Sequence, residues 1–266
     1  MVTTSATFAG PQHYDDYLGP AWFAAHAADL ASRVPTDSPG DVLEIACGTG
    51  FVTQRLREHL GHSTRLVATD LSKVTLDYAR AKFSGRNDIE WHEADALRLP
   101  FEDGSFGTVV CGFGIMFVPD RVAALKEGRR VLVDEGLLVF NVWDRLENNP
   151  AAVANAAVLE SLFPGDAEMH FRAPFDMYDQ AFLRDLLARA RFREVRIETT
   201  RIPIERVDPK TLAIGMIRGT PRSALIEKRG VSLDSVIEKV AASLKASGGD
   251  PYYGHTQAVT VEARAV

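Results

Sequence analysis

The stretch Val42–Gly50 decides the fold, because its sequence VLEIACGTG runs from an apolar strand straight into a glycine-rich turn. The strand carries an acid, Glu44, near its middle, and Gly48 and Gly50 form a Gly-x-Gly turn behind it. Glycine has no side chain to block a ligand, so such a turn lets the backbone approach a small molecule closely. The stretch therefore predicts a ligand site at the end of the first strand.

Strands and helices alternate from this stretch onward. The pattern predicts strands at 42–47, 64–70, 89–93, 106–112 and 136–143, with helices at 51–59, 71–83 and 122–133. Parallel strands need crossover helices, so this alternation favours an α/β fold with a mostly parallel, twisted sheet and helices on both faces. Ligands of such sheets bind at the carboxyl ends of the strands. Gly48, Asp70, Asp95 and Gly112 all fall there.

The segments outside this core differ in character. Residues 193–205 and 257–265 alternate like strands and predict an antiparallel edge of the same sheet. We expect one domain over residues 1–266, with helical segments at 1–35, 145–190 and 207–255 acting as a lid or cover over the substrate.

Composition excludes several classes of protein. The net charge of −6 and the pI of about 5.7 argue against nucleic-acid binding. Cys47 and Cys111 are too few for a disulfide framework, and no apolar run reaches the ~18 residues that span a bilayer. No signal peptide and no metal-ligand cluster are recognised. We expect a cytoplasmic protein with no membrane or nucleic-acid partner and no metal. It would act on a small-molecule substrate and could form a homodimer.

The spacing of the turn bears on the ligand. In a dinucleotide site a third glycine follows, whereas Thr53 stands at that position here. Glu44 would repel a pyrophosphate and would suit a ligand with a cationic end. An NAD(P)-dependent oxidoreductase stays open as an alternative, and Glu44 could instead be a strand-edge acid paired with a lysine.

The next two acids indicate an adenosine. Asp70 ends the second strand, where a carboxylate accepts both ribose hydroxyls. Asp95 follows the third strand and could accept from the exocyclic amine of adenine, while the amide of Ala96 donates to a ring nitrogen. Leu71 and Leu97 could enclose the base. The alternative role for Asp95 is that of a turn residue or helix cap.

An adenine, a free ribose and a cationic zwitterionic tail together describe S-adenosylmethionine. The chain here resembles the class I S-adenosylmethionine-dependent methyltransferases, in particular the small-molecule enzymes similar to ubiquinone and menaquinone methyltransferases (methyltransferase type 11). The resemblance covers roughly residues 38–145, and it is carried by VLEIACGTG, VATDLS, EADALRLPFEDGSF, VVCGFGIMFVPDR and EGRRVLVDEGLLVFNVWD. It implies a Rossmann-like methyltransferase fold and cofactor contacts from Glu44, Ala46, Gly48, Thr49, Gly50, Asp70, Leu71, Asp95, Ala96 and the backbone of Gly112.

Further candidates lie on segments expected to cover the strand ends. We expect Tyr14 to fold over the cofactor, and the substrate to meet Tyr17, Phe113, Met116, Trp143 and Arg172. His170 is the candidate general base, which is needed only if the acceptor must lose a proton early. The aromatic residues could equally be packing residues. The leading function is methyl transfer to a small organic acceptor, and a cofactor-binding protein without catalysis is a further alternative.

Overall fold

The computed structural model describes residues 10–36, 40–169 and 172–266. The chain divides into two compact units. The sheet unit comprises 26–145, 173–200 and 257–266, and the helical unit comprises the described parts of 1–25, 146–172 and 201–256.

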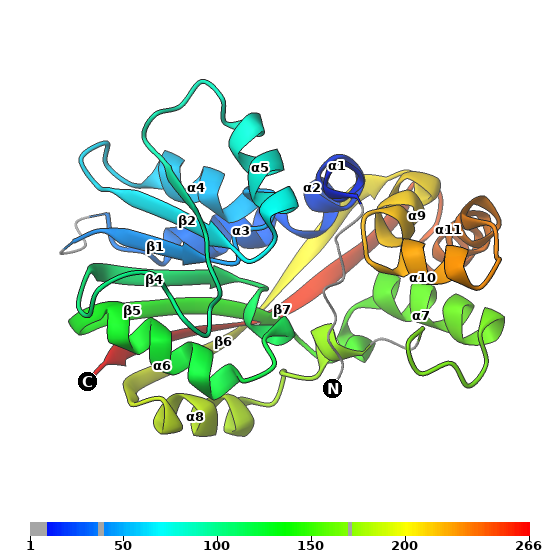
Figure 1. The fold of residues 1–266 in the computed structure, drawn as a ribbon. Helices are drawn as coiled ribbons and strands as arrows, with labels where there is room; N and C mark the ends of the chain where they lie inside the picture. The colour runs from blue at the N-terminus through cyan, green and yellow to red at the C-terminus, as the bar shows by residue number, and fades with distance from the viewer. Residues whose placement is uncertain (1–9, 37–39, 170–171) are drawn as a thin grey trace. The chain divides into compact units, whose positions relative to one another are not determined.

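The sheet follows the order β3-β2-β1-β4-β5-β7-β6, seven strands within the described residues. Their bounds are β1 (Val42–Ile45), β2 (Leu66–Asp70), β3 (Glu90–Glu93), β4 (Phe106–Gly112), β5 (Leu132–Trp143), β6 (Phe192–Val207) and β7 (Tyr252–Ala265). The pairs among β1 to β5 are parallel, and β7 runs antiparallel to β5 (Figure 1). The expected mostly parallel sheet with an antiparallel edge is thereby confirmed.

Burial explains why the central strands read as continuous apolar runs. Every residue of β1 is buried, and so are the residues of β4 before Gly112. Strands covered on both faces need apolar side chains on both. Glu44 is the exception in β1, and its register partners Ala68 of β2 and Val110 of β4 are apolar. A buried acid between two apolar neighbours needs a specific hydrogen-bond partner.

Helices lie on both faces of the sheet in Figure 1, with α4 and α5 on one face and α6 and α8 on the other. The bounds are α3 (Ala24–Ser32), α4 (Phe51–His59), α5 (Lys73–Lys82), α6 (Arg121–Val131) and α8 (Gln180–Arg189). Ser72 caps α5 by accepting from the Thr75 amide, and Asp120 caps α6 by accepting from the Ala123 amide.

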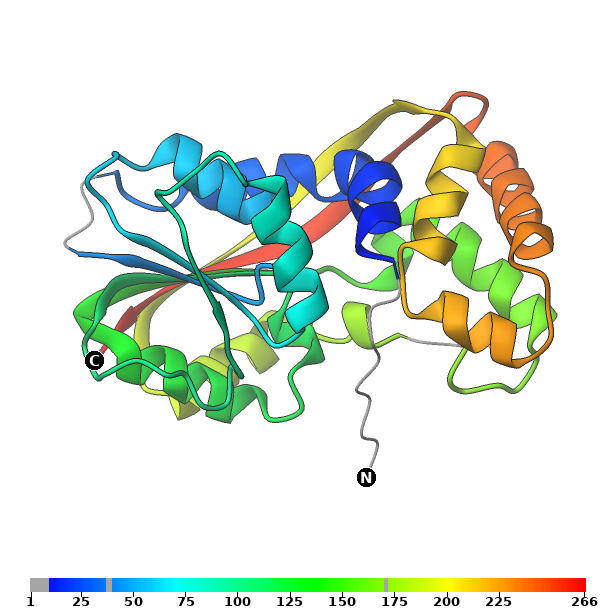
Figure 2. The same ribbon diagram turned by 45° about the horizontal axis from the view of Figure 1, so that its top comes forward.

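The helical unit packs around its longest helix, α11. Figure 2 shows this unit from a second angle. Its α-helices are α1 (Pro11–His13), α2 (Gly19–Trp22), α7 (Pro150–Leu162), α9 (Pro209–Arg218), α10 (Arg222–Lys228) and α11 (Leu233–Gly248). The short π-helix η1 (Tyr14–Leu18) lies between α1 and α2 in the sequence. Both α7 and α9 pack against α11, and η1 packs against α9. The buried face of α11 repeats at helical spacing through Val236, Val240 and Leu244. That these helices cover a substrate stays a prediction.

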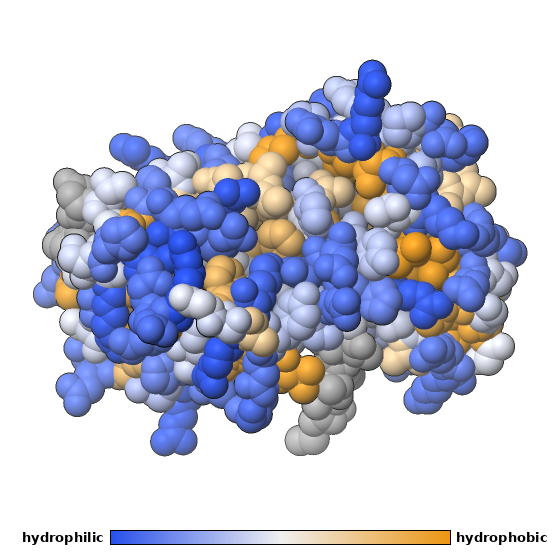
Figure 3. All heavy atoms as spheres, turned by 90° about the horizontal axis from the view of Figure 1, so that it is seen from above, coloured by the Kyte–Doolittle hydropathy of each residue, from blue (hydrophilic) through white to orange (hydrophobic). Residues whose placement is uncertain are grey.

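The surface is mixed in character. On the face seen in Figure 3, hydrophilic residues predominate and hydrophobic ones appear in groups among them. Large apolar side chains are nonetheless exposed at Leu71, Val74 and Phe117. Among the helices of the described residues, none combines the length and the apolar character that crossing a bilayer requires.

Candidate functional site

The glycine turn after β1 has an unusual backbone. Ala46, Gly48 and Gly50 take positive φ values of 55°, 56° and 87°. The amide of Cys47 donates to the Thr69 carbonyl at 2.9 Å, which ties the turn to β2. A side chain added at Gly48 would meet nothing within 4 Å, whereas one at Gly50 would lie 2.7 Å from the Phe83 ring. Gly48 therefore presents bare backbone to open space, and Gly50 is required by packing.

Glu44 lies beneath this turn and is only 1% exposed. Its Oε2 accepts from the Thr53 hydroxyl at 2.6 Å, and its carboxylate also accepts from the Thr53 amide. Burial raises the pKa of Glu44 to about 8, the nearby Asp70 charge adds to the rise, and the Thr53 bonds oppose it. The first turn of a helix has amide groups without intrahelical partners, so Glu44 fixes the start of α4 by satisfying one of them.

Asp70 joins the end of β2 to the glycine turn. Its Oδ2 accepts from the Gly48 amide at 2.9 Å and its Oδ1 accepts from the Ser72 amide at 2.8 Å. Burial raises its pKa, while these two amide bonds lower it. A carboxylate oxygen accepts more than one hydrogen bond, so both oxygens retain capacity for a ligand hydroxyl.

The residues predicted to meet adenine fall after β2 and β3. Leu71 directly follows Asp70, and its side chain is 68% exposed. Asp95 is exposed, and its Oδ1 accepts from the Leu97 amide at 2.9 Å, as in an Asx turn. Asp95 therefore has the turn role considered as its alternative, and its contact with a ligand stays a prediction.

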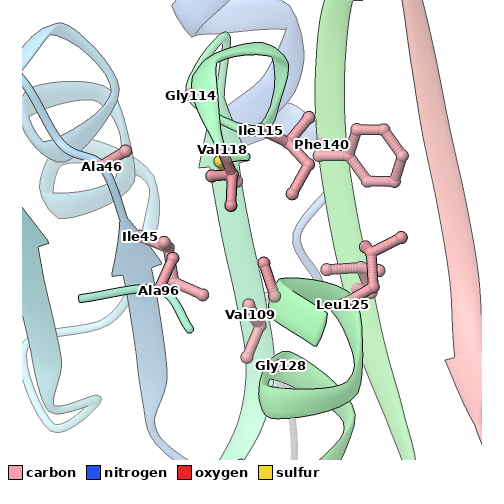
Figure 4. Close-up of a pocket in the computed structure, with 13 residues that line it drawn as sticks. Ile45, Ala46, Ala96, Val109, Gly114, Ile115, Val118, Leu125, Gly128 and Phe140 are labelled. Atoms are coloured by element: carbon pink, nitrogen blue, oxygen red, sulfur yellow. The ribbon is translucent and has the colours of Figure 1, made fainter. Parts of the chain in front are cut away.

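A narrow apolar cavity of about 20 Å³ opens beside the turn. Figure 4 shows Ala46 and Ala96 on the side of β1, facing Gly114, Ile115 and Phe140 across it. Two residues predicted to bind the cofactor thus line one cavity. Its volume holds about one water molecule, so it is too small to contain a cofactor.

The ends of β4 and β5 meet in an aromatic cluster. Phe113 takes a positive φ of 57°, and its amide donates to Oδ1 of Asn141 at 3.0 Å. Its ring stacks on Trp143 with centroids 3.9 Å apart, and His26 meets both rings edge-on. The Trp143 amide donates to the sulfur of Met116 at 3.4 Å. The structure thus brings together three residues predicted to contact substrate, and all three are buried.

Gly112 is explained by packing. A side chain there would approach Cγ2 of Val52 at 2.6 Å. No larger residue fits between β4 and α4, so only the backbone of Gly112 is available to a ligand.

The other candidates belong to the helical unit. Tyr14 packs against Phe23 with ring centroids 4.9 Å apart, and burial raises its pKa. Tyr17 stacks near His13 at 5.8 Å, and Arg172 is exposed. His170 lies outside the described residues. The roles of all four stay predictions.

The structure adds residues that sequence reasoning missed. Thr53, the partner of Glu44, was noted only for not being glycine. Asn141 holds the backbone of Phe113, and an asparagine inside the apolar run VFNVW was a signal that could have found it. Within the part of the chain that the structure describes, no three histidine, cysteine or acidic residues are grouped to hold a metal ion.

Comparisons with known proteins agree with this geometry. Residues 43–140 match the family model of a methyltransferase domain. The demethylmenaquinone methyltransferase of Staphylococcus saprophyticus is 37% identical over 102 residues, which are 38% of this chain and 44% of that protein. The chain thus spans less than half the length of this curated relative.

Solved structures resemble the whole fold at low identity. The YcgJ protein of Bacillus subtilis has a TM-score of 0.58 at 16% identity and covers 90% of this chain and 98% of its own. Phosphoethanolamine N-methyltransferase 2 of Haemonchus contortus, solved with phosphomonomethylethanolamine and S-adenosylhomocysteine, has a TM-score of 0.63 at 16% identity and covers 98% of this chain and 58% of its own. The predicted Rossmann-like fold and the resemblance to methyltransferases are confirmed, and residues 43–140 match a methyltransferase domain.

Proposed function

We propose that this chain is an S-adenosylmethionine-dependent methyltransferase that transfers a methyl group to a small organic acceptor. The observation that carries the proposal is the joint arrangement of Gly48 and Asp70. The bare backbone of Gly48 faces open space, and its amide is bonded to the carboxylate that ends the neighbouring strand. The methyltransferase match over residues 43–140 supports the same assignment.

The residues fit an adenosine. Asp70 retains acceptor capacity for the two hydroxyls of a ribose. The exposed Leu71, next in sequence, offers an apolar surface to a purine ring. The Thr49 hydroxyl is buried and has no hydrogen-bond partner within the described residues, so a polar ligand group at the turn would satisfy it.

The start of α4 disfavours a dinucleotide. A pyrophosphate binds the free amide groups at a helix N-terminus. Here the Thr53 amide is donated to Glu44, so this amide is not available to a phosphate. This arrangement argues against the NAD(P)-dependent alternative.

When bound, S-adenosylmethionine supplies an electrophilic methyl group on a sulfonium. The chain needs no nucleophile of its own, and its task is to orient the acceptor and exclude water. Orientation of this kind contributes roughly 7–11 kcal/mol to barrier lowering. Phe113, Met116 and Trp143 form a buried apolar cluster at the ends of β4 and β5, and we propose that it backs the acceptor site.

The proposed acceptor is small and partly hydrophobic. An apolar wall with few polar groups suits such a molecule. The matched relative is named for demethylmenaquinone, so a demethylated naphthoquinol is a reasonable first probe. The family match ends at residue 140, so it does not include the later segments proposed to cover the acceptor.

The test is cofactor binding and turnover in Asp70→Ala. We expect the variant to bind S-adenosylhomocysteine about 10- to 150-fold more weakly, the loss typical of hydrogen bonds to a charged group. Asp77→Ala is the matched control, because Asp77 is an exposed acid of α5 paired with Lys73. Calorimetry measures the affinities, and S-adenosylhomocysteine release in the presence of candidate acceptors measures turnover.

Three results would contradict the proposal or part of it. Tight binding of NADH would favour the oxidoreductase. Equal affinities in wild type and Asp70→Ala would remove Asp70 from the site. Binding of S-adenosylhomocysteine with no methylation of any acceptor in a broad panel would favour a cofactor-binding protein without catalysis.

A further inference from the structure

We propose that Lys82 is a positioning residue for the cofactor, which acts by holding the Thr49 carbonyl of the glycine turn. The inference deepens the proposed function and rests on it. Lys82 is the last residue of α5 and donates from Nζ to the Thr49 carbonyl at 3.2 Å. It thus connects the helix after β2 to the turn after β1.

Two aromatic rings hold the lysine in place. Its Nζ lies 4.6 Å from the ring centroid of Phe51 and 5.8 Å from that of Phe83. Both distances lie within the range of cation–π attraction. Phe51 is the first residue of α4, directly after the turn, and Phe83 directly follows α5. The ammonium therefore sits where the turn, α4 and α5 meet.

The Thr49 carbonyl needs such a donor. Thr49 is only 1% exposed. Thr49 lies before Gly50, the N-cap of α4, so its carbonyl is outside the helical hydrogen-bond series, which begins with the Gln54 amide donating to Gly50. The Thr53 amide is donated to Glu44. A buried carbonyl without a donor is costly. Glu44 and Lys82 therefore act as a pair, since the acid takes the amide and the lysine serves the carbonyl.

The ring of Phe83 completes the support. It lies so close to Gly50 that an added side chain there would be 2.7 Å from its Cε2 atom. Gly48 is meanwhile fixed by its amide bond to Asp70. The turn is thus held by an anion at the Gly48 amide and by a cation at the Thr49 carbonyl. Backbone fixed before the ligand arrives loses less entropy on binding.

The experiment compares three variants by calorimetry with S-adenosylhomocysteine. Lys82→Met keeps the aliphatic stem and removes the ammonium, and we expect it to weaken binding by about fivefold. Lys82→Arg keeps both a donor and a cation, and we expect it to bind like the wild type. Lys73→Met is the matched control, because it removes the same charge from an exposed lysine at the other end of α5, paired with Asp77.

The outcomes separate this inference from the proposed function. If the wild type does not bind S-adenosylhomocysteine, the proposed function fails. If the wild type binds and Lys82→Met binds equally well, Lys82 has no positioning role while the function stands. Equal weakening in Lys73→Met would show that the effect comes from the net charge of the chain. Equal weakening in Lys82→Arg would show that a cationic donor at this position is not what supports binding. Either result overturns the inference. Thermal unfolding of each variant distinguishes a stability loss from an affinity loss.

Discussion

Replacing Glu44 with glutamine should remove a large pH dependence of stability. The pKa of Glu44 is raised from 4.5 to about 8 in the folded chain. Between these two values the folded state therefore holds a proton that the unfolded chain has released. Stability is fully present below the unfolded pKa and falls as pH rises toward the folded pKa. The cause is burial of the carboxyl, which favours its neutral form.

The magnitude follows from the size of the shift. Each pH unit within the window lowers the unfolding free energy by about 1.4 kcal/mol. From about pH 5 to about pH 8 the wild type should therefore lose about 4 kcal/mol that Glu44→Gln does not lose. The amide keeps an oxygen to accept from the Thr53 hydroxyl, so the fold is retained.

The assay is urea unfolding of the cofactor-free protein at several pH values, followed by tryptophan fluorescence. The quantity of interest is the difference in unfolding free energy between variant and wild type, because contributions from other groups largely cancel in it. Glu102→Gln, at an exposed loop position, controls for the loss of an acid. A difference that stays constant from pH 5 to pH 8 would refute the reasoning.

Two further predictions concern the buried side chains of Arg57 and His26. Arg57→Met should lower the unfolding free energy by about 3 kcal/mol or more, because the buried guanidinium donates to the carbonyls of Thr64, Asp88, Leu60 and Gly61. Urea unfolding measures the loss, with Arg55→Met at an exposed arginine as the control. Equal losses in the two variants would contradict the prediction. Burial lowers the pKa of His26 to about 4 despite the opposing Asp29 charge, so the unfolded chain takes up the proton first and wild-type stability should fall by about 3 kcal/mol as pH drops from 6.5 to 4. His26→Gln should lack this loss. An NMR titration in which the His26 ring of the folded protein titrates near pH 6.5 would disprove the burial effect.

The sequence predicted the site best where local patterns determine position. Parallel strands bring their carboxyl ends to one edge, so the sequence positions of Gly48 and Asp70 sufficed to place them together. The edge strands were also predicted in kind, although β6 and β7 are longer than expected. Strand β5 begins at Leu132, earlier than the predicted 136, because the backbone leaves the helical region there with ψ 141°.

Roles that depend on burial and on contacts from other elements were harder to predict. The sequence marked Glu44 as an anion facing a ligand, but its protonation depends on burial that a sequence does not show. The sequence placed Gly112 at the end of a strand, and only the position of Val52 explains why a glycine stands there. Lys82 lies 33 residues from Thr49, and no spacing rule connects them. Contacts of this kind form only when α4 and α5 pack on the sheet.

A crystal structure of the chain with S-adenosylhomocysteine would locate the cofactor directly. We expect the ribose hydroxyls on the Asp70 carboxylate, the amino-acid end against the bare backbone of Gly48, and the adenine against Leu71. Ligand density at any other place, or a ribose pointing away from Asp70, would contradict this expectation.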